Sequence, residues 1–309
     1  MVTRVEVEAA QARIAGRIRR TPLLDTGDGR LWIKCEFLQH AGVFKTRGAF
    51  NRQLAARERG ELDDRNGIVV ASGGNAGLAN AYAASVLGVP ATVFVPANAP
   101  AVKVDRLRAY GAVVHQVGTE YADAYDAATT HAAEQDAVFV HAYDQSEVVA
   151  GAGTLGLEIL EDEPSIDTIV VAVGGGGLYA GVAAAAHDRA RIVAVEPTSI
   201  PTLRSALDAG RPVDVTVSGI TADSLGARRV GEIAFEVAQR TGPTSVLVGD
   251  DDITAARTAL WGRYRIPAEY GAAAAYAALT SGAYVPEPGE RVAVLICGAN
   301  TDPATLAQE

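Results

Sequence analysis

The sequence predicts an α/β protein with two lobes, each built on a mostly parallel β-sheet. From residue 67 onward, short apolar runs alternate with Ala-rich stretches of helical character, which is the pattern of βαβ units. The same alternation resumes after residue 150 and ends with the apolar run at 291–296. A chain of 309 residues is also long enough for two cores, because single hydrophobic cores stop growing near this length.

The first sixty residues contain two predicted helices and one predicted strand. Residues 1–20 place apolar residues among charged ones at helical spacing, which predicts the first helix. The segment TPLL (21–24) breaks that pattern, and LWIKCEFL (31–38) has the composition of a strand. A second helix is predicted over 42–60, so Lys45 would lie at its beginning.

The rest of the chain alternates between apolar strands and Ala-rich helices. Apolar runs of this length, bounded by turn residues, are typical of buried strands. The predicted strands are 67–72, 89–95, 112–117, 137–142, 167–173, 191–196 and 291–296, and the helices include 151–162 and 178–189. No low-complexity linker and no repeat of fixed period separates them, so short crossings are expected to join the lobes.

Composition excludes several classes of partner. The net charge of -10 and the pI of about 5.1 oppose nucleic acids and anionic membranes, and no dense Lys/Arg run overrides that average. The N-terminal segment lacks the continuous apolar core of a signal peptide or membrane span, so we expect a cytoplasmic protein. Two cysteines, Cys35 and Cys297, make neither a disulfide framework nor a CxxC zinc motif.

Two glycine-rich turns are candidate anion sites. Gly174–Gly177 lies between a predicted strand and a predicted helix, where backbone amides can surround a phosphate. A tight turn is the alternative explanation, and the spacing matches neither GxGxxG nor a Walker loop. The second turn, SGGNAG (72–77), offers amides, the Ser72 hydroxyl and the Asn75 amide to a carboxylate, although Asn75 could also be a capping residue.

Lys45 is the candidate nucleophile. It lies in FKTRGA (44–49), between apolar residues and one cation, an environment that can desolvate an amine and lower its pKa. Most lysines are solvated surface groups, so the segment alone leaves both interpretations open.

Five segments together resemble the fold-type II pyridoxal-phosphate enzymes, in the order seen in that family. They are FKTRGAFN (44–51), SGGNAG (72–77), AGAGTLGLEIL (150–160), VGGGGLYAG (173–181) and CGAN (297–300). The chain is most similar to catabolic serine/threonine dehydratases (threonine ammonia-lyases) without a regulatory domain. The resemblance implies two open, twisted lobes with the cofactor between them: a large cofactor-binding domain (1–55 and 139–309) and a small substrate-binding domain (56–138).

The resemblance also implies roles for particular residues. Lys45 would carry pyridoxal 5'-phosphate as a Schiff base, and Cys297 would face the pyridine nitrogen. Phe44 and Asn75 would contact the ring. The phosphate would be held by Gly174, Gly175, Gly176, Gly177 and Leu178, and the substrate carboxylate by Ser72, Gly73, Gly74, Asn75 and Ala76.

The function implied is a deaminating dehydratase, a carbon–nitrogen lyase that removes water and then ammonia from L-threonine, L-serine or a related β-hydroxy amino acid to give a 2-oxo acid. A thiol in place of a carboxylate at the pyridine nitrogen favours elimination over transamination. Alternatives are a 3-hydroxyaspartate-type dehydratase or another β-elimination or β-replacement enzyme with the same cofactor. A non-catalytic binder on this fold and a dinucleotide-dependent oxidoreductase are further alternatives.

Several positions depart from relatives of this kind. Gly73 stands where racemases carry a serine, so racemase activity should be weak or absent. Glu196 matches one ligand of a divalent-ion site, but Thr202 replaces the second, so no metal site is expected. Arg47 and Glu269 are expected to be solvated or paired on the surface. A homodimer is the family expectation.

Overall fold

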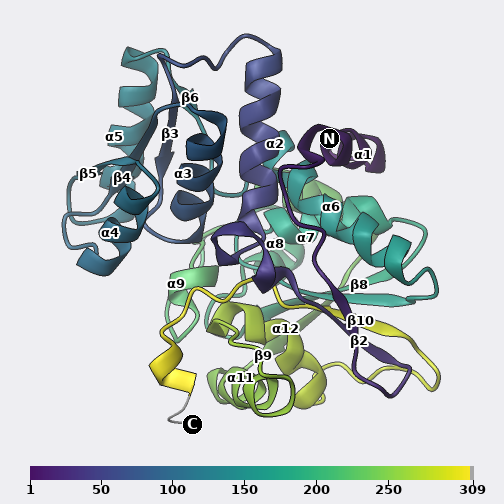
Figure 1. Ribbon diagram of the computed structural model, residues 1–309. Coiled ribbons are helices and arrows are strands. Elements are labelled where there is room, and N and C mark those ends of the chain that lie inside the picture. Colours follow the sequence, from purple (N-terminus) through teal and green to yellow (C-terminus); the bar gives the residue numbers. More distant parts are fainter. Residues whose placement is uncertain (307–309) are drawn as a thin grey trace.

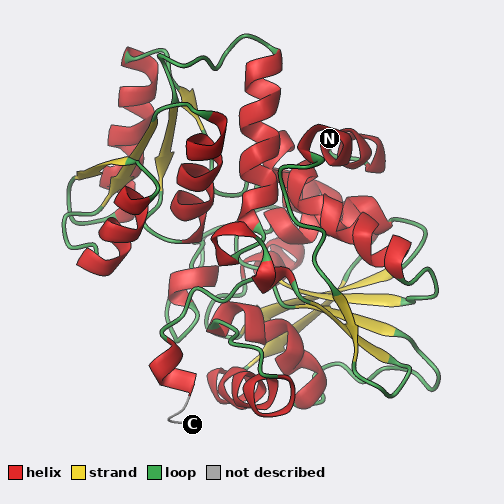
Figure 2. Cartoon of the chain, viewed as in Figure 1, coloured by secondary structure: helices red, strands yellow, loops and turns green. Residues whose placement is uncertain are grey.

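The computed structural model describes residues 1–306 and contains two β-sheets, with helices on their faces (Figures 1 and 2). The strands are β1 Leu23–Asp25, β2 Leu31–Lys34, β3 Ile68–Ala71, β4 Ala91–Val95, β5 Val113–Gln116, β6 Val138–Phe139, β7 Thr168–Ala172, β8 Arg191–Pro197, β9 Thr244–Val248 and β10 Val292–Leu295. The helices are α1 Arg4–Ile14, α2 Lys45–Glu58, α3 Asn75–Leu87, α4 Ala101–Ala109, α5 Tyr121–Glu134, α6 Ser146–Asp162, α7 Gly177–Ala186, α8 Thr202–Ala209, α9 Ala222–Leu225, α10 Glu232–Thr241, α11 Asp250–Tyr264 and α12 Tyr270–Thr280. Three short 3-10 helices are η1 Glu36–Leu38, η2 His40–Gly42 and η3 Pro303–Leu306.

The larger sheet has six strands in the order β1-β2-β10-β7-β8-β9. All neighbouring strands are parallel except β1 and β2. Helices α6 and α7 lie on one side of this sheet, and α11 and α12 lie on the other (Figure 1). The central strands are buried on both faces, which explains their unbroken apolar sequences.

The smaller sheet has four parallel strands in the order β5-β4-β3-β6. Helix α5 packs on β3 and β4, while α3 covers the opposite face (Figure 1). Each sheet has its own principal hydrophobic core. Helix α2 packs against both α3 and α6, so the helix that begins at Lys45 lies between the two lobes (Figure 1).

These elements confirm the predicted α/β class and mostly parallel sheets, with corrections at several boundaries. The strand predicted over 31–38 ends at Lys34, because Phe37 donates instead to the carbonyl of Ile296 as η1 begins. The predicted break at TPLL is wrong in its second half, where β1 begins and pairs with β2. The strand predicted over 137–142 keeps only Val138–Phe139, since the His141 amide donates to the Gln145 side chain. Strand β9 was not predicted.

Two helix boundaries also differ from the sequence prediction. Helix α6 begins at Ser146 rather than 151, and α7 ends at Ala186 rather than 189. Helix boundaries shift because terminal turns depend on tertiary contacts more than on propensity. Among residues 1–306, no helix combines the length and the apolar character needed to cross a bilayer.

Candidate active site

A cleft with an empty volume of about 670 Å³ lies where α2, α3, α7 and the end of β10 meet. This is the size range of small-molecule sites, and in parallel sheets such sites form beyond the carboxyl ends of strands. The Phe44 amide donates to the Cys297 carbonyl at 3.0 Å, which joins the Lys45 segment to the end of β10. Of the predicted site residues, the cleft is lined by Phe44, Lys45, Asn75, Gly174, Gly175, Gly176, Gly177, Leu178 and Cys297.

Lys45 directs its amine into this cleft. The residue is partly buried, and its Nζ donates a hydrogen bond of 3.0 Å to the backbone carbonyl of Ala142. Desolvation lowers the pKa of the amine to about 8, against a smaller opposing attraction from Cys297 and Glu269. A neutral amine is the nucleophilic form, so Lys45 is chemically competent near neutral pH.

The four-glycine loop follows β7 and opens α7. A Cβ on Gly175 would lie 2.4 Å from the Tyr143 ring, and one on Gly174 would lie 2.9 Å from the Leu225 Cα. Gly176 has a φ of 87°, a conformation that glycine adopts without a steric penalty. The loop therefore needs glycine for close packing, and it leads into a helix N-terminus whose first amides have no partner within the helix.

The SGGNAG turn holds Asn75 in a hydrogen-bond network. The Asn75 Nδ2 donates to both carboxylate oxygens of Glu269, at 2.8 and 3.1 Å. Its Oδ1 accepts from the Asn300 Nδ2 at 2.7 Å. This network joins α3 to the ends of two distant segments. Asn75 thus does more than cap the turn.

The other predicted substrate-binding residues divide into two groups. Gly73 and Gly74 line a smaller cavity beside the main cleft. As the described residues form them, neither cavity is lined by Ser72 or Ala76. Ala76 is buried within α3, because side chains on successive helical residues point in different directions.

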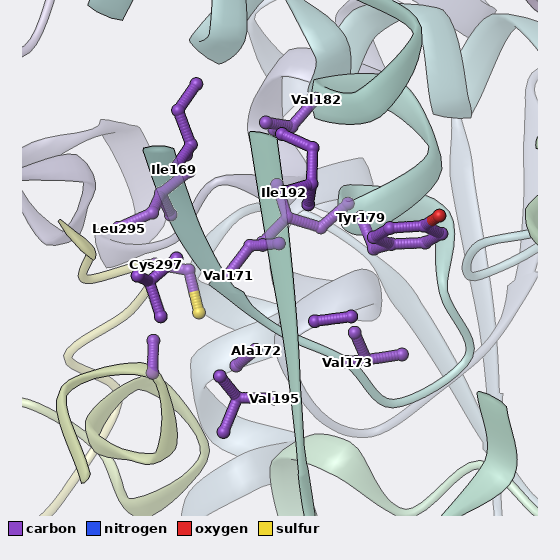
Figure 3. Close-up of a cluster of buried hydrophobic side chains, with 14 of the residues drawn as sticks. Ile169, Val171, Ala172, Val173, Tyr179, Val182, Ile192, Val195, Leu295 and Cys297 are labelled. Carbon is purple, nitrogen blue, oxygen red and sulfur yellow. The ribbon is translucent and has the colours of Figure 1, made fainter. Parts of the chain in front are cut away.

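Cys297 follows β10 and belongs to the hydrophobic core of the larger lobe (Figure 3). Burial and the nearby Glu269 carboxylate raise the pKa of its thiol. The protonated thiol is a weak hydrogen-bond donor. The cleft therefore presents a neutral sulfur group at the position where CGAN begins.

Glu269 was wrongly expected to be solvated. Its side chain lines both cavities, and the residue is only 7% exposed. Burial raises the pKa of the carboxyl to about 7. The apolar run that follows it, YGAAAAYAAL (270–279), is the sequence signal that could have predicted burial, since Glu269 is the N-cap of α12.

Arg47 was also wrongly expected at the surface. It is fully buried, with Nε donating to Glu36 at 2.7 Å and NH1 donating to Glu158 at 2.6 Å. Lys34, also fully buried, donates to Glu158 at 2.7 Å. These four side chains form a buried charge cluster (Lys34, Glu36, Arg47 and Glu158) around the helix that begins with Lys45. Its charges balance within the cluster.

Glu196 has acceptor sites that are already in use. Its carboxylate accepts from the backbone amides of Leu203 and Arg204, at 2.6 and 2.8 Å, and from the Thr202 hydroxyl at 3.1 Å. Thr202 also donates to the Gly174 carbonyl at 2.6 Å. Residues 1–306 contain no cluster of three His, Cys, Asp or Glu side chains that could hold a metal ion.

The family model of pyridoxal-phosphate dependent enzymes matches residues 14–298. The chain belongs to this family. It is 34% identical to an L-threonine ammonia-lyase of Thermotoga maritima, over 98% of this chain and 76% of that protein. It is also 34% identical to a phenylserine dehydratase of Ralstonia pickettii, over 98% and 94%.

Solved structures agree with this family assignment. Maize serine racemase superposes with a TM-score of 0.90 at 31% identity, covering 99% of this chain and 96% of that one. A serine racemase from Dictyostelium discoideum superposes with a TM-score of 0.88 at 31% identity, covering 97% and 99%. A bacterial-type threonine deaminase fold is matched equally well, with a TM-score of 0.89 at 32% identity. The cofactor of this family member is pyridoxal phosphate.

Proposed function

We propose that this chain is a pyridoxal-phosphate-dependent dehydratase and ammonia-lyase that acts on L-threonine, L-serine or a related β-hydroxy amino acid. The observation that carries the proposal is Lys45, whose desolvated amine enters a glycine-lined cleft that also contains a thiol rather than a carboxylate at the end of β10. The names of the threonine ammonia-lyase and phenylserine dehydratase relatives support the same reaction class. The products would be a 2-oxo acid and ammonia.

The cleft residues fit the cofactor. The glycine loop leaves room that any Cβ at Gly174 or Gly175 would remove, so the loop and the first turn of α7, with Leu178, would hold the phosphate. Lys45 would hold the aldehyde carbon, with Phe44 and Asn75 beside the ring and Cys297 at the pyridine nitrogen. When bound, pyridoxal phosphate supplies an electron sink for the bond broken at the substrate Cα.

The chain's own residues would position the substrate and move its proton. Gly73, Gly74 and Asn75, at the start of α3, would bind the substrate carboxylate through backbone amides and the side-chain amide, with Ser72 and Ala76 supporting the turn. Lys45, as a neutral amine, would take the α-proton, because its pKa of about 8 suits a general base near neutral pH. Loss of the β-hydroxyl would follow.

Racemisation is the principal rival, since a serine racemase shares the fold. A racemase needs a second acid/base on the opposite face of the substrate. Gly73 has no side chain to supply it, and a Cβ there would lie 3.2 Å from the Val95 Cγ1. Elimination is therefore the reaction that this pocket favours. A β-replacement enzyme is the second rival, and it would require an added nucleophile.

The test compares wild type with Lys45→Ala. Wild type should absorb in the visible range as a lysine-bound cofactor, and should release 2-oxo acid and ammonia in equal amounts from serine, threonine or 3-hydroxyaspartate. Lys45→Ala should lose both properties, whereas Arg108→Ala, an exposed change on α4, should keep them. A colourless wild type would refute the cofactor assignment, and product formed only with an added nucleophile would indicate replacement.

Organisation and assembly are part of the same proposal. We propose a large cofactor-binding domain (1–55 and 139–309), a small substrate-binding domain (56–138) and a cytoplasmic homodimer. Light scattering on the eluting protein should give twice the chain mass of 32.0 kDa. A mass of one chain at working concentration would contradict the dimer.

A further inference from the structure

A second cavity, with an empty volume of about 320 Å³, adjoins the main cleft on the side of the SGGNAG turn. The two cavities share Asn75 and Glu269 in their linings. The glycine turn forms one side of the second cavity, and Lys103 and Arg106 from α4 also line it. The two cations are three residues apart, so they lie on one face of the helix.

Only one of these cations is balanced by a carboxylate. Lys103 forms an ion pair with Asp223 of α9. Arg106 donates from NH2 to the Asn300 Oδ1 at 2.5 Å. Within the described part of the chain, residues 1–306, Arg106 has no carboxylate partner. Its guanidinium therefore keeps a net positive charge and several donors available to a ligand.

The position of Arg106 is fixed relative to the reaction cleft. The Asn300 Nδ2 donates to the Ala41 carbonyl at 3.0 Å and to the Asn75 Oδ1 at 2.7 Å, which turns the Asn300 oxygen toward Arg106. Asn75 in turn donates to Glu269. A hydrogen-bond chain thus leads from Arg106 to the cleft.

We propose that the second cavity receives an anionic group attached to the substrate β-carbon, and that Arg106 selects β-hydroxy amino acids with a second carboxylate, such as 3-hydroxyaspartate. The inference rests on the proposed function, in which Gly73 and Gly74 bind the α-carboxylate. The β-substituent would then lie beside the glycine turn, where a planar guanidinium can bind a carboxylate through paired hydrogen bonds. The hydroxyl remains the leaving group.

The first experiment measures binding to the cofactor-loaded enzyme without requiring turnover. L-Aspartate and L-alanine differ by one carboxylate on the β-carbon, and neither has a β leaving group. Wild type should bind aspartate more tightly than alanine. Arg106→Ala should weaken aspartate binding by about tenfold or more, as for a lost hydrogen bond to a charged group, and leave alanine binding within about twofold.

Arg108→Ala is the matched control, because Arg108 is an exposed cation on the same helix, lies outside the lining and pairs with Asp105. It removes the same charge and should change neither affinity. Equal binding of both amino acids by wild type would overturn the proposal. So would equal losses for both in Arg106→Ala, or equal effects of the two variants, since these outcomes indicate α-carboxylate binding or general electrostatics.

The second experiment compares kcat/KM for 3-hydroxyaspartate and serine. The preference for 3-hydroxyaspartate should fall by the same factor in Arg106→Ala, with the melting temperature unchanged. A preference unaffected by the substitution would overturn the inference. If neither compound is dehydrated while the Arg106-dependent preference for aspartate persists, the proposed reaction fails and the anion-selective cavity stands.

Discussion

Two lysines near α2 have their amines within the protein but have opposite electrostatic surroundings. Lys34 is fully buried and forms ion pairs with Glu158 at 2.7 Å and Asp162 at 3.7 Å. Lys45 directs its amine at a backbone carbonyl in the cleft, and desolvation lowers its pKa to about 8. A counter-charge keeps a buried amine charged, whereas burial beside neutral groups favours the neutral form. Lys34 is thus suited to structure and Lys45 to chemistry.

Lys45→Met gives the largest expected effect and tests the chemical side of this contrast. Turnover should fall by at least about a thousandfold, within the range for loss of an acid/base group that is also the cofactor anchor. Stability of the cofactor-free protein at pH 7 should stay level or rise. The pKa of Lys45 lies below its unfolded value of 10.5, so its charging destabilises the fold as pH falls from 10.5 to about 8. Urea denaturation checks this.

Lys34→Met is the matched variant for that comparison. It should lower the free energy of unfolding while any folded fraction retains turnover per bound cofactor. If Lys34→Met abolished turnover in folded, cofactor-loaded protein, or if Lys45→Met unfolded the chain, the division between a structural and a chemical lysine would be wrong.

Arg47→Met tests the buried charge cluster. It leaves Glu36 and Glu158 with only Lys34 and the Thr21 hydroxyl as buried partners. Breaking a buried ion pair by removing one partner costs about 3–5 kcal/mol, so the melting temperature and the urea midpoint should fall. A variant as stable as wild type would show that the cluster contributes no net stability. Arg52→Met, whose partner Glu61 is more exposed, should cost far less.

Glu269→Gln sharpens the contrast through pH. The pKa of Glu269 is raised to about 7 in the fold, so its contribution to stability is lost as pH rises from about 4.5 to about 7. The variant should flatten that window in the cofactor-free protein by roughly 1–3 kcal/mol. The Lys45 window lies higher, between about 8 and 10.5, and should persist. Urea midpoints from pH 5 to pH 10 separate the two groups.

Cys297→Ser is the smallest expected change. A hydroxyl is a better hydrogen-bond donor than a thiol and adds no charge near Lys45, so turnover should change by about threefold or less, under 1 kcal/mol. Cys297→Asp is its contrast, because a carboxylate there would give Lys45 a counter-charge like that of Lys34. The pH at which kcat/KM is half-maximal on the acid side should therefore rise in Cys297→Asp and stay unchanged in Cys297→Ser. Equal pH profiles for the two variants would contradict this.

The local motifs determined much of this protein from the sequence alone. The α/β class, Lys45 at the start of α2 and the glycine loop between β7 and α7 were each predictable, because a strand, a turn and a helix leave their pattern in one short segment. Tertiary structure decided the rest. Asn75 meets Glu269 across 194 residues of sequence, and Arg47 meets Glu158 across 111. Burial of a charge depends on such long-range packing, so the surroundings of Glu269, Arg47 and Arg106 become visible only in the folded chain.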